Sequence, residues 1–365
     1  MHEMERALYE RLANRLDAIP NGFPRTASGV ELEILARLFR PEEAALAAVM
    51  RLRPEPATEI AERAGVGAEE ALQHLKNMAR RGLILARHKE GELQFGLLPW
   101  VVGIYEAQLP RMDADLARLV EQYFQEAYTQ EALRVEPAFH RVIPVQEAVP
   151  TGIEIAPYQQ VQGILAEARS FGVRDCICRV QRRLAGHPCD HPVENCLVFS
   201  PYEHAFDHAE EEGVRPITRE EAYAVLAAAR DAGLVHTVNN VQGRHGYICN
   251  CCTCSCGLLR GIREFGILNA VARSPFRSQV DPSLCTGCGE CVERCQFGAL
   301  ALVDDVCRVD SMRCLGCGQC VLACSTGALR LEPRPAEEVP QPPRDRMEWM
   351  MQRARARGLS LRDMV

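Results

Sequence analysis

The chain has 365 residues, a length that suits two or three domains. Hydrophobic residues make up 47% and charged residues 25%, the composition of an ordinary globular protein. The formal net charge of −7 argues against the basic surface of most nucleic-acid-binding proteins. No run approaches about 18 apolar residues, so a membrane-spanning helix is excluded. The first residues lack the apolar core of a secretory signal, and we expect a cytoplasmic protein.

Lysine and cysteine usage narrow the chemistry further. Lys76 and Lys89 are the only lysines and no Gly-Lys pair occurs, so a phosphate-binding P-loop is excluded. All 18 cysteines lie at or after Cys176, and most are closely spaced. In a cytoplasmic protein such spacing indicates metal ligands rather than disulfides.

Residues 1–40 are predicted to form an amphipathic helix and a loop, and residues 41–130 a separate helical region. In the latter, helices are expected at 42–52, 57–64, 68–81 and around 116–123, and hairpin strands at 83–87 and 92–95. The first three helices and the hairpin resemble the winged-helix fold of MarR-type regulators. The resemblance implies a module that binds DNA or docks a partner. The third helix exposes Glu69 and Glu70 where DNA would be met, so DNA is the disfavoured partner.

Residues 150–275 are predicted to form an α+β, cysteine-rich domain. Apolar residues at helical spacing predict a helix over 161–168, which we expect to lead directly into Cys176. Another helix is expected to begin at Thr218, where Thr218 and Glu221 can form a capping box, and to end at Gly233. Nine cysteines flank that helix, four before it and five after it: Cys176, Cys178, Cys189, Cys196, Cys249, Cys251, Cys252, Cys254 and Cys256.

The density of these nine thiols indicates metal binding, in one or two further iron–sulfur clusters whose ligand subset is open. In an extended chain Cys252, Cys254 and Cys256 would point to one face and Cys251 to the other. The histidines nearby, His187, His191 and His245, are interpreted as hydrogen-bond partners of thiolates or loop backbone, with a mixed His/Cys site as the alternative. Three arginines near Cys178 can balance cluster charge or dock an anionic partner: Arg179, Arg182 and Arg183.

The strongest pattern is an internal repeat in residues 278–332. The run C-x2-C-x2-C-x3-C begins at Cys285 and recurs at Cys314. Glycines at 287, 289, 316 and 318 are expected to let the loops wrap a cluster that side chains would crowd. The pattern is very similar to bacterial ferredoxins with two 4Fe-4S clusters, in which the fourth cysteine of each run binds the other cluster. The resemblance implies Cys285, Cys288, Cys291 and Cys324 for cluster I, and Cys314, Cys317, Cys320 and Cys295 for cluster II.

Two features depart from that family pattern. Gln296 and Ser325 stand where a proline usually follows the fourth cysteine. Cys307, between the two runs, is interpreted as a small buried hydrophobic residue rather than a ligand. Beyond the repeat, residues 333–365 are predicted to be an extended Pro-rich spacer and a short helix.

The order winged helix, CxCR motif, NCC-x-C run and paired ferredoxin motifs resembles a group of prokaryotic 4Fe-4S dicluster proteins of anaerobic metabolism. In that group the run reads closer to CNCCxCCC, and Ser255 replaces one cysteine. We therefore expect an α+β multidomain protein that passes electrons between two 4Fe-4S clusters and a central metal site, with a redox protein as partner. The alternatives are an iron–sulfur reductase of a small molecule and a redox-sensing regulator.

Overall fold

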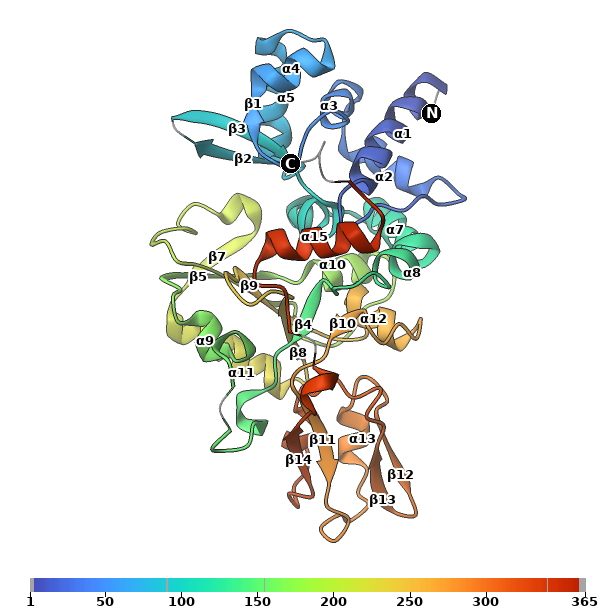
Figure 1. Cartoon of the computed structure of the whole chain (residues 1–365), viewed down its shortest axis with the longest axis vertical. Coiled ribbons are helices and arrows are strands. Elements are labelled where there is room, and N and C mark those ends of the chain that lie inside the picture. Colours follow the sequence, from blue (N-terminus) through green and yellow to red (C-terminus); the bar gives the residue numbers. More distant parts are fainter. Residues whose placement is uncertain (1–2, 90, 154, 340, 361–365) are drawn as a thin grey trace. The chain divides into compact units, whose positions relative to one another are not determined.

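The computed structural model describes residues 3–89, 91–153, 155–339 and 341–360, and it combines helices with several sheets (Figure 1). The chain divides into two compact units. The first contains Met1–Val135, Val180–His187 and Met350–Val365, and the second contains Glu136–Arg179 and Pro188–Trp349. Among the described residues, no helix is both long and apolar enough to cross a membrane.

The first unit is mainly helical. It starts with α1 (Glu3–Asp17), whose buried face includes Leu12 and Leu16 as the apolar spacing predicts. The helices and short turns that follow are α2 (Val30–Leu38), α3 (Pro41–Ala47), α4 (Ala57–Ala64), α5 (Ala68–Arg80), η1 (Trp100–Ile104), α6 (Tyr105–Ala107), η2 (Leu109–Arg111), α7 (Ala114–Tyr123), η3 (Phe124–Tyr128) and α8 (Thr129–Ala132). Its three-stranded sheet has the order β1-β3-β2, from β1 (Glu55–Pro56), β2 (Ile84–Lys89) and β3 (Glu92–Leu97).

The elements expected between residues 41 and 97 are present in the predicted order. Helix α4 has the predicted bounds, and Gly65 ends it with a φ of 70°, a conformation that favours glycine. Helix α3 is shorter than expected and ends at Ala47. Strands β2 and β3 pair antiparallel from Ile84↔Leu97 to Lys89↔Glu92. The winged-helix assignment itself stays a prediction.

The C-terminal helix α15 (Arg346–Ala356) stabilises the first unit through its second half. Arg353 is fully buried there, and its guanidinium donates hydrogen bonds to the backbone carbonyls of Pro20, Ala132 and Val135. Arg357, just after the helix, donates to the carbonyl of Ile19 at 2.6 Å. The helix therefore ties together segments that are more than 300 residues apart in the sequence.

The second unit is built on a seven-stranded sheet with the order β10-β4-β8-β9-β6-β5-β7. The neighbouring strands pair antiparallel except β10 and β4, which are parallel. The strands are β4 (His140–Val142), β5 (Ser170–Asp175), β6 (Glu194–Ser200), β7 (Val214–Ile217), β8 (Val235–Asn239), β9 (Tyr247–Cys251) and β10 (Val271–Ala272).

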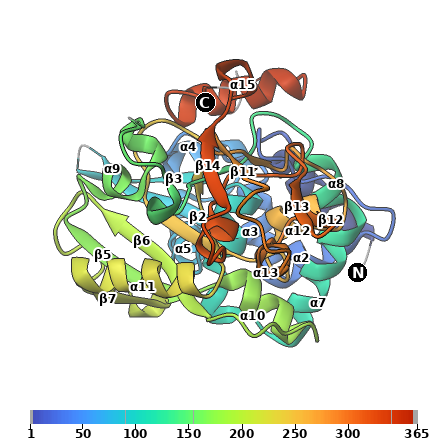
Figure 2. The same cartoon turned by 90° about the horizontal axis from the view of Figure 1, so that it is seen from below.

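Helices α9 (Val161–Leu165) and α11 (Arg219–Asp231) cover one face of this sheet (Figure 2). Leu165 and Leu226 of these helices share a buried cluster with Leu197 and Ile248 of the strands. The capping box of Thr218 and Glu221 is confirmed at the start of α11. Helix α9 is shorter than predicted and does not lead into Cys176, because β5 lies between them. The remaining elements before the repeat are η4 (Gln146–Ala148), η5 (Pro157–Gln159), α10 (Ile177–Leu184), η6 (Glu210–Glu212) and α12 (Gly257–Arg263).

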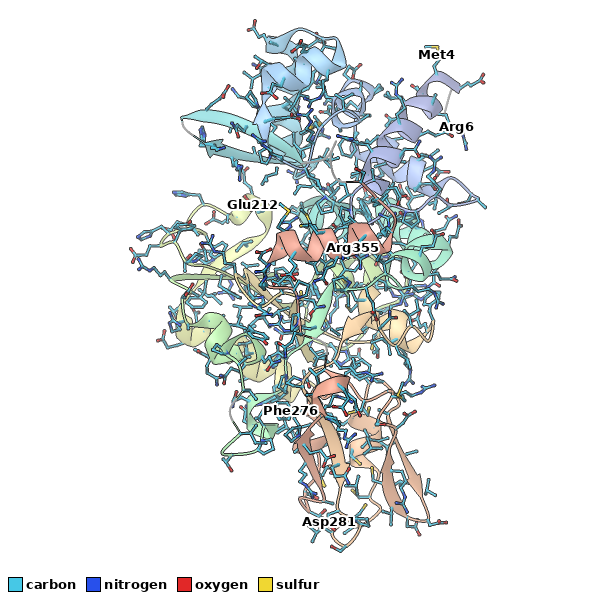
Figure 3. The ribbon with its side chains drawn as sticks, in the orientation of Figure 1. Met4, Arg6, Glu212, Phe276, Asp281 and Arg355 are labelled. Atoms are coloured by element: carbon cyan, nitrogen blue, oxygen red, sulfur yellow. The ribbon has the colours of Figure 1, made fainter. Side chains whose placement is uncertain are left out.

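The repeat near the C-terminus has matching elements in its two halves. Each cysteine run contains a short helix and is followed by a strand: α13 (Glu290–Arg294) and β12 (Leu300–Val303), then α14 (Gln319–Leu322) and β14 (Leu329–Pro333). β12 pairs with β13 (Val306–Val309), and β14 pairs with β11 (Phe276–Val280). Figure 3 labels Phe276 and Asp281 near the two ends of β11. The region thus begins and ends on two paired strands.

The Pro-rich segment after the repeat, which includes η7 (Ala336–Glu338), is more than a spacer. The backbone N–H of Gln242 donates to the carbonyl of Pro343 at 2.9 Å, and its side chain donates to that of Pro342 at 2.8 Å. Trp349 then donates to the carbonyl of Ala138 at 2.9 Å. These bonds hold the segment against the rest of the second unit, an outcome that proline content alone does not predict.

Candidate metal centres

The cysteines of the repeat line two separate cavities. One cavity is lined by Cys285, Cys288, Cys291 and Cys324. The other is lined by Cys295, Cys314, Cys317 and Cys320. Each cavity gathers three cysteines of one run with the fourth cysteine of the other, which is the arrangement that exchanged fourth ligands require.

Backbone and hydroxyl groups around both cavities point at the cysteine sulfurs. The N–H groups of Cys307 and Ala299 donate to Cys285 Sγ and Cys295 Sγ, each at 3.4 Å. The hydroxyl of Ser278 lies 3.0 Å from Cys320 Sγ. Such donors stabilise negative charge on sulfur, so the two cavities fit iron–sulfur clusters bound by thiolates.

Two of the loop glycines are required by the packing of the backbone around them. Gly287 and Gly316 have φ values of +70° and +68°. A Cβ at Gly287 would lie 2.5 Å from the carbonyl oxygen of Asp305, and one at Gly316 would lie 2.0 Å from that of Phe276. Backbone packing by itself therefore excludes side chains at these two positions.

Cys307 is buried in β13, as its apolar surroundings predict, but it also lines the first cavity. Its Sγ lies 3.6 Å from Cys291 Sγ. Burial, and then the hydrogen bond to Cys291, raise the pKa of Cys307 to about 12. Its interpretation as a non-ligand stays a prediction.

Six central thiols form a continuous chain of sulfur contacts, which we call the six-thiol group. In spatial order they are Cys176, Cys178, Cys256, Cys251, Cys249 and Cys196. They come from the end of β5, the start of α10, the strands β6 and β9, and the residue before α12. Three stretches of chain, 176–178, 196 and 249–256, thus converge on one site.

Strand alternation explains how three of these thiols meet. Ile248 of β9 and Leu197 of β6 pair with each other and contribute to the core under α9 and α11. Cys249, Cys251 and Cys196 occupy the alternate positions and therefore face the opposite side of the sheet. The hydroxyl of Thr237, on β8, lies 3.5 Å from Cys251 Sγ on that side.

The thiols of this group differ in acidity because they hydrogen-bond to one another. Hydrogen bonding with Cys249 lowers the pKa of Cys196 and of Cys251, and the same contacts raise the pKa of Cys249. Arg174 and Arg179 also lower the pKa of Cys196. Thiolate is the form in which cysteine binds metals, and these contacts favour it at Cys196 and Cys251.

The other three central cysteines assemble with a histidine. Sγ of Cys189, Cys252 and Cys254 and a ring nitrogen of His191 all lie within 4.8 Å of one another. We call these four residues the Cys/His group. Cys252 is buried, Cys189 and His191 are half-buried, and Cys254 is exposed. His191 was expected to serve as a hydrogen-bond partner, and its place here favours the mixed His/Cys alternative.

The expectation for an extended chain after β9 is wrong. Residues 252–256 form a turn in which the N–H of Cys256 donates to the carbonyl of Cys252 at 3.0 Å. The turn sends Cys252 and Cys254 to the Cys/His group and Cys256 to the six-thiol group. Ser255 is buried beside them, with its hydroxyl 3.4 Å from Cys189 Sγ.

Arg179 lies between the two central groups. Its buried guanidinium donates to the side chain of Asn195 at 2.9 Å and to the carbonyl of Asn250 at 3.0 Å. Burial acts to lower the pKa of Arg179, but its electrostatic interactions with Cys176, Cys252 and Cys251 outweigh burial and raise that pKa. Arg182 instead pairs with Glu121 in the first unit, and Arg183 is exposed.

The other histidines have ordinary partners. His187 is exposed, and it is not a member of the Cys/His group. His245 contacts the side chain of Asn239 at 2.7 Å, and burial together with Arg141 lowers its pKa to about 3. All three histidines lie within four residues of a cysteine in the sequence, so proximity alone does not separate these two from His191.

The 4Fe-4S binding domain family matches residues 278–301 and 308–330, one match for each half of the repeat. The C-terminal region is therefore a ferredoxin-type region with two such repeats. Searches of curated proteins and of solved structures find no match to the chain.

Proposed function

We propose that the chain is an iron–sulfur electron-transfer protein whose ferredoxin-type region exchanges electrons with a metal centre in the central domain. The support is the contact between this region and the backbone that carries the central cysteines. Gln296, which follows Cys295, accepts a hydrogen bond from the Thr253 N–H at 2.7 Å. Thr253 is the residue between Cys252 and Cys254.

The same contact surface includes the C-terminal end of α11. Gln296 and Gln319 donate to the carbonyls of Gly233 and Leu234, at 2.5 and 2.7 Å. Arg294 donates to the carbonyl of Asp231 at 2.9 Å. The Asp231 carbonyl lies in the last turn of α11, where carbonyls have no partner within the helix and carry partial negative charge, so the Arg294 cation stabilises the contact there.

This arrangement explains the departure at Gln296. A proline at this position has no side-chain amide and could make neither the bond to Thr253 nor the one to Gly233. When bound, 4Fe-4S clusters accept and release single electrons. Cys295, which lines the second cavity, is the residue next to Gln296, and Gln296 contacts the central cysteine segment at Thr253.

Rapid-freeze EPR during anaerobic reduction by dithionite tests the proposal. In the unmodified chain we expect the ferredoxin-type signals first and a central signal at their expense. Cys314→Ser removes a proposed cluster II ligand, and it should slow the central signal while the cluster I signal remains. Cys307→Ser is the matched control and should leave the order and the rates unchanged. A central signal that forms equally fast in Cys314→Ser, or no central iron, would overturn the proposal.

For the first unit we propose partner docking rather than DNA binding. The start of α5 exposes Glu69 and Glu70, and carboxylates there repel phosphates. A mobility shift with random duplex DNA at low salt tests this, with Arg87→Ala/Lys89→Ala as the comparison. We expect no binding by either protein, and binding that the double substitution abolishes would favour a regulator.

A further inference from the structure

The Cys/His group differs in compactness from the other cysteine sites of the same chain. It is the only set of three or more Cys, His, Asp or Glu ligand atoms in the described part of the chain that all lie within 4.8 Å. Neither the thiols around the two ferredoxin-type cavities nor those of the six-thiol group form such a set. The sites that suit clusters are thus spread out, and this one is not.

Compactness separates one metal ion from a cluster. A tetrahedral zinc ion with Zn–S bonds of about 2.3 Å holds two thiolates roughly 3.8 Å apart. Each thiolate of a cubane binds a different iron atom, so its four ligands must stand further apart. The distance between Cys254 Sγ and His191 Nδ1 is 4.0 Å, near the value for one shared ion.

The composition of the group points the same way. Three thiolates and one imidazole make a complete tetrahedral set, and structural zinc sites use this combination. The ligands come in two close pairs, Cys189 with His191 and Cys252 with Cys254, each on a short loop or turn. Cys252 and Cys189 also pack against Ala229 and Leu234, so apolar contacts hold the buried side of the site in place.

We propose that Cys189, His191, Cys252 and Cys254 bind a single zinc ion, separate from any iron–sulfur cluster of the protein. Binding would release the protons of the three thiols to solvent and leave His191 neutral, coordinated through one ring nitrogen. The ion would join the loop before β6 to the turn after β9. Because Thr253 lies within that turn, zinc would also hold the backbone that Gln296 contacts.

This inference goes beyond the proposed electron-transfer role and can fail independently of it. Zinc does not change oxidation state, so it serves to fix the turn and passes no electrons. The central redox site would then be the six-thiol group, which shares the turn through Cys256.

Iron and zinc analysis of the full chain, purified anaerobically from cells grown with both metals, provides the test. We expect one zinc per chain in addition to iron. Cys254→Ser and His191→Ala should each lower zinc affinity about tenfold or more and leave the iron-to-chain ratio unchanged. Cys254 is exposed, so its substitution leaves the buried packing in place. His187→Ala, in the same loop but outside the group, is the matched control and should keep its zinc.

Cobalt provides a second readout that does not depend on redox activity. Protein grown with Co2+ should show the intense visible absorption of tetrahedral thiolate-bound cobalt, lost in Cys254→Ser and kept in His187→Ala. If Cys254→Ser instead loses several irons and no zinc, the group holds part of a cluster and the proposal is wrong. Unchanged zinc and iron in both ligand variants would equally overturn it.

Discussion

The guanidinium of Arg179 is bonded to the carbonyl of Asn250, at 3.0 Å, on the strand segment between Cys249 and Cys251. A second bond, to the Asn195 side chain at 2.9 Å, fixes it next to Cys196. A buried cation held in this way lowers the energy of every negative charge around it. The charge on the six-thiol group is therefore set partly by one residue.

Arg179→Met should make the reduction potential of a central cluster more negative, because reduction adds negative charge that Arg179 stabilises. A loss of about 1–3 kcal/mol corresponds to roughly 40–130 mV for one electron. Redox titration monitored by EPR measures the shift. Arg183→Met, exposed on the same helix α10, should leave the potential unchanged. Equal potentials in the two variants would show that Arg179 acts only in packing.

Cys295→Ser should remove cluster II and spare cluster I. Cys295 lies in the same cavity as Cys314, Cys317 and Cys320, although it belongs to the first run. Iron and sulfide analysis should show a loss of about four irons, and EPR should retain the other signal. If cluster I is lost instead, each run binds its own cluster and the exchange of fourth ligands is wrong.

Gly316→Ala should destabilise the ferredoxin-type region more than Gly327→Ala. Both glycines have positive φ, +68° and +69°, so both substitutions add backbone strain of about 1 kcal/mol. Only at Gly316 would the Cβ collide with a backbone oxygen, whereas Gly327 has nothing within 4 Å. Cluster release during urea titration should occur at lower urea in Gly316→Ala. Equal urea midpoints in the two variants would mean that β11 shifts to accommodate the added Cβ at no cost in stability.

Acidification should destabilise the second unit through His140. Burial lowers the pKa of His140 to about 4, and its ring contacts Thr237 at 3.2 Å and Tyr247 at 2.8 Å. The unfolded chain, with a His pKa of about 6.5, then binds a proton before the folded chain does. Stability is complete above about pH 6.5 and falls between there and pH 4, by about 1 kcal/mol at pH 5.5 and about 3 kcal/mol in all.

Urea unfolding at pH 7.5 and 5.5 measures this loss. His140→Gln should lose less stability between the two pH values than the unmodified chain. His204→Gln, at an exposed histidine, should behave like the unmodified chain. An identical pH dependence in His140→Gln would show that His140 takes up its proton without unfolding.

The sequence predicted local features well where a few neighbouring residues decide them. The capping box of Thr218 and Glu221, the helix end at Gly65 and the mixed α+β class were all read correctly. The division of the central cysteines was not predictable, because it depends on a turn after Cys251 and on the facing of β6 and β9. Helix 161–168 was overextended because an apolar stripe does not show where β5 begins.

The role of Gln296 was out of reach for a different reason. Its partners, Thr253 and Gly233, lie 43 and 63 residues away in the sequence. The departure from proline was visible in the sequence, but the surface that makes use of it was not. Arg353 is similar, since nothing near it in the sequence indicates carbonyl partners hundreds of residues away.

The pairing of Phe276 with Pro333 brings the two ends of the ferredoxin-type region together. The chain enters and leaves this region at one place and then resumes contact with the central domain at Pro342 and Pro343. In topological terms the region is an insertion within the second unit. Such an insertion can be gained, lost or exchanged in evolution with little change to the path of the rest of the chain. In an engineered chain, a short turn could replace residues 277–332.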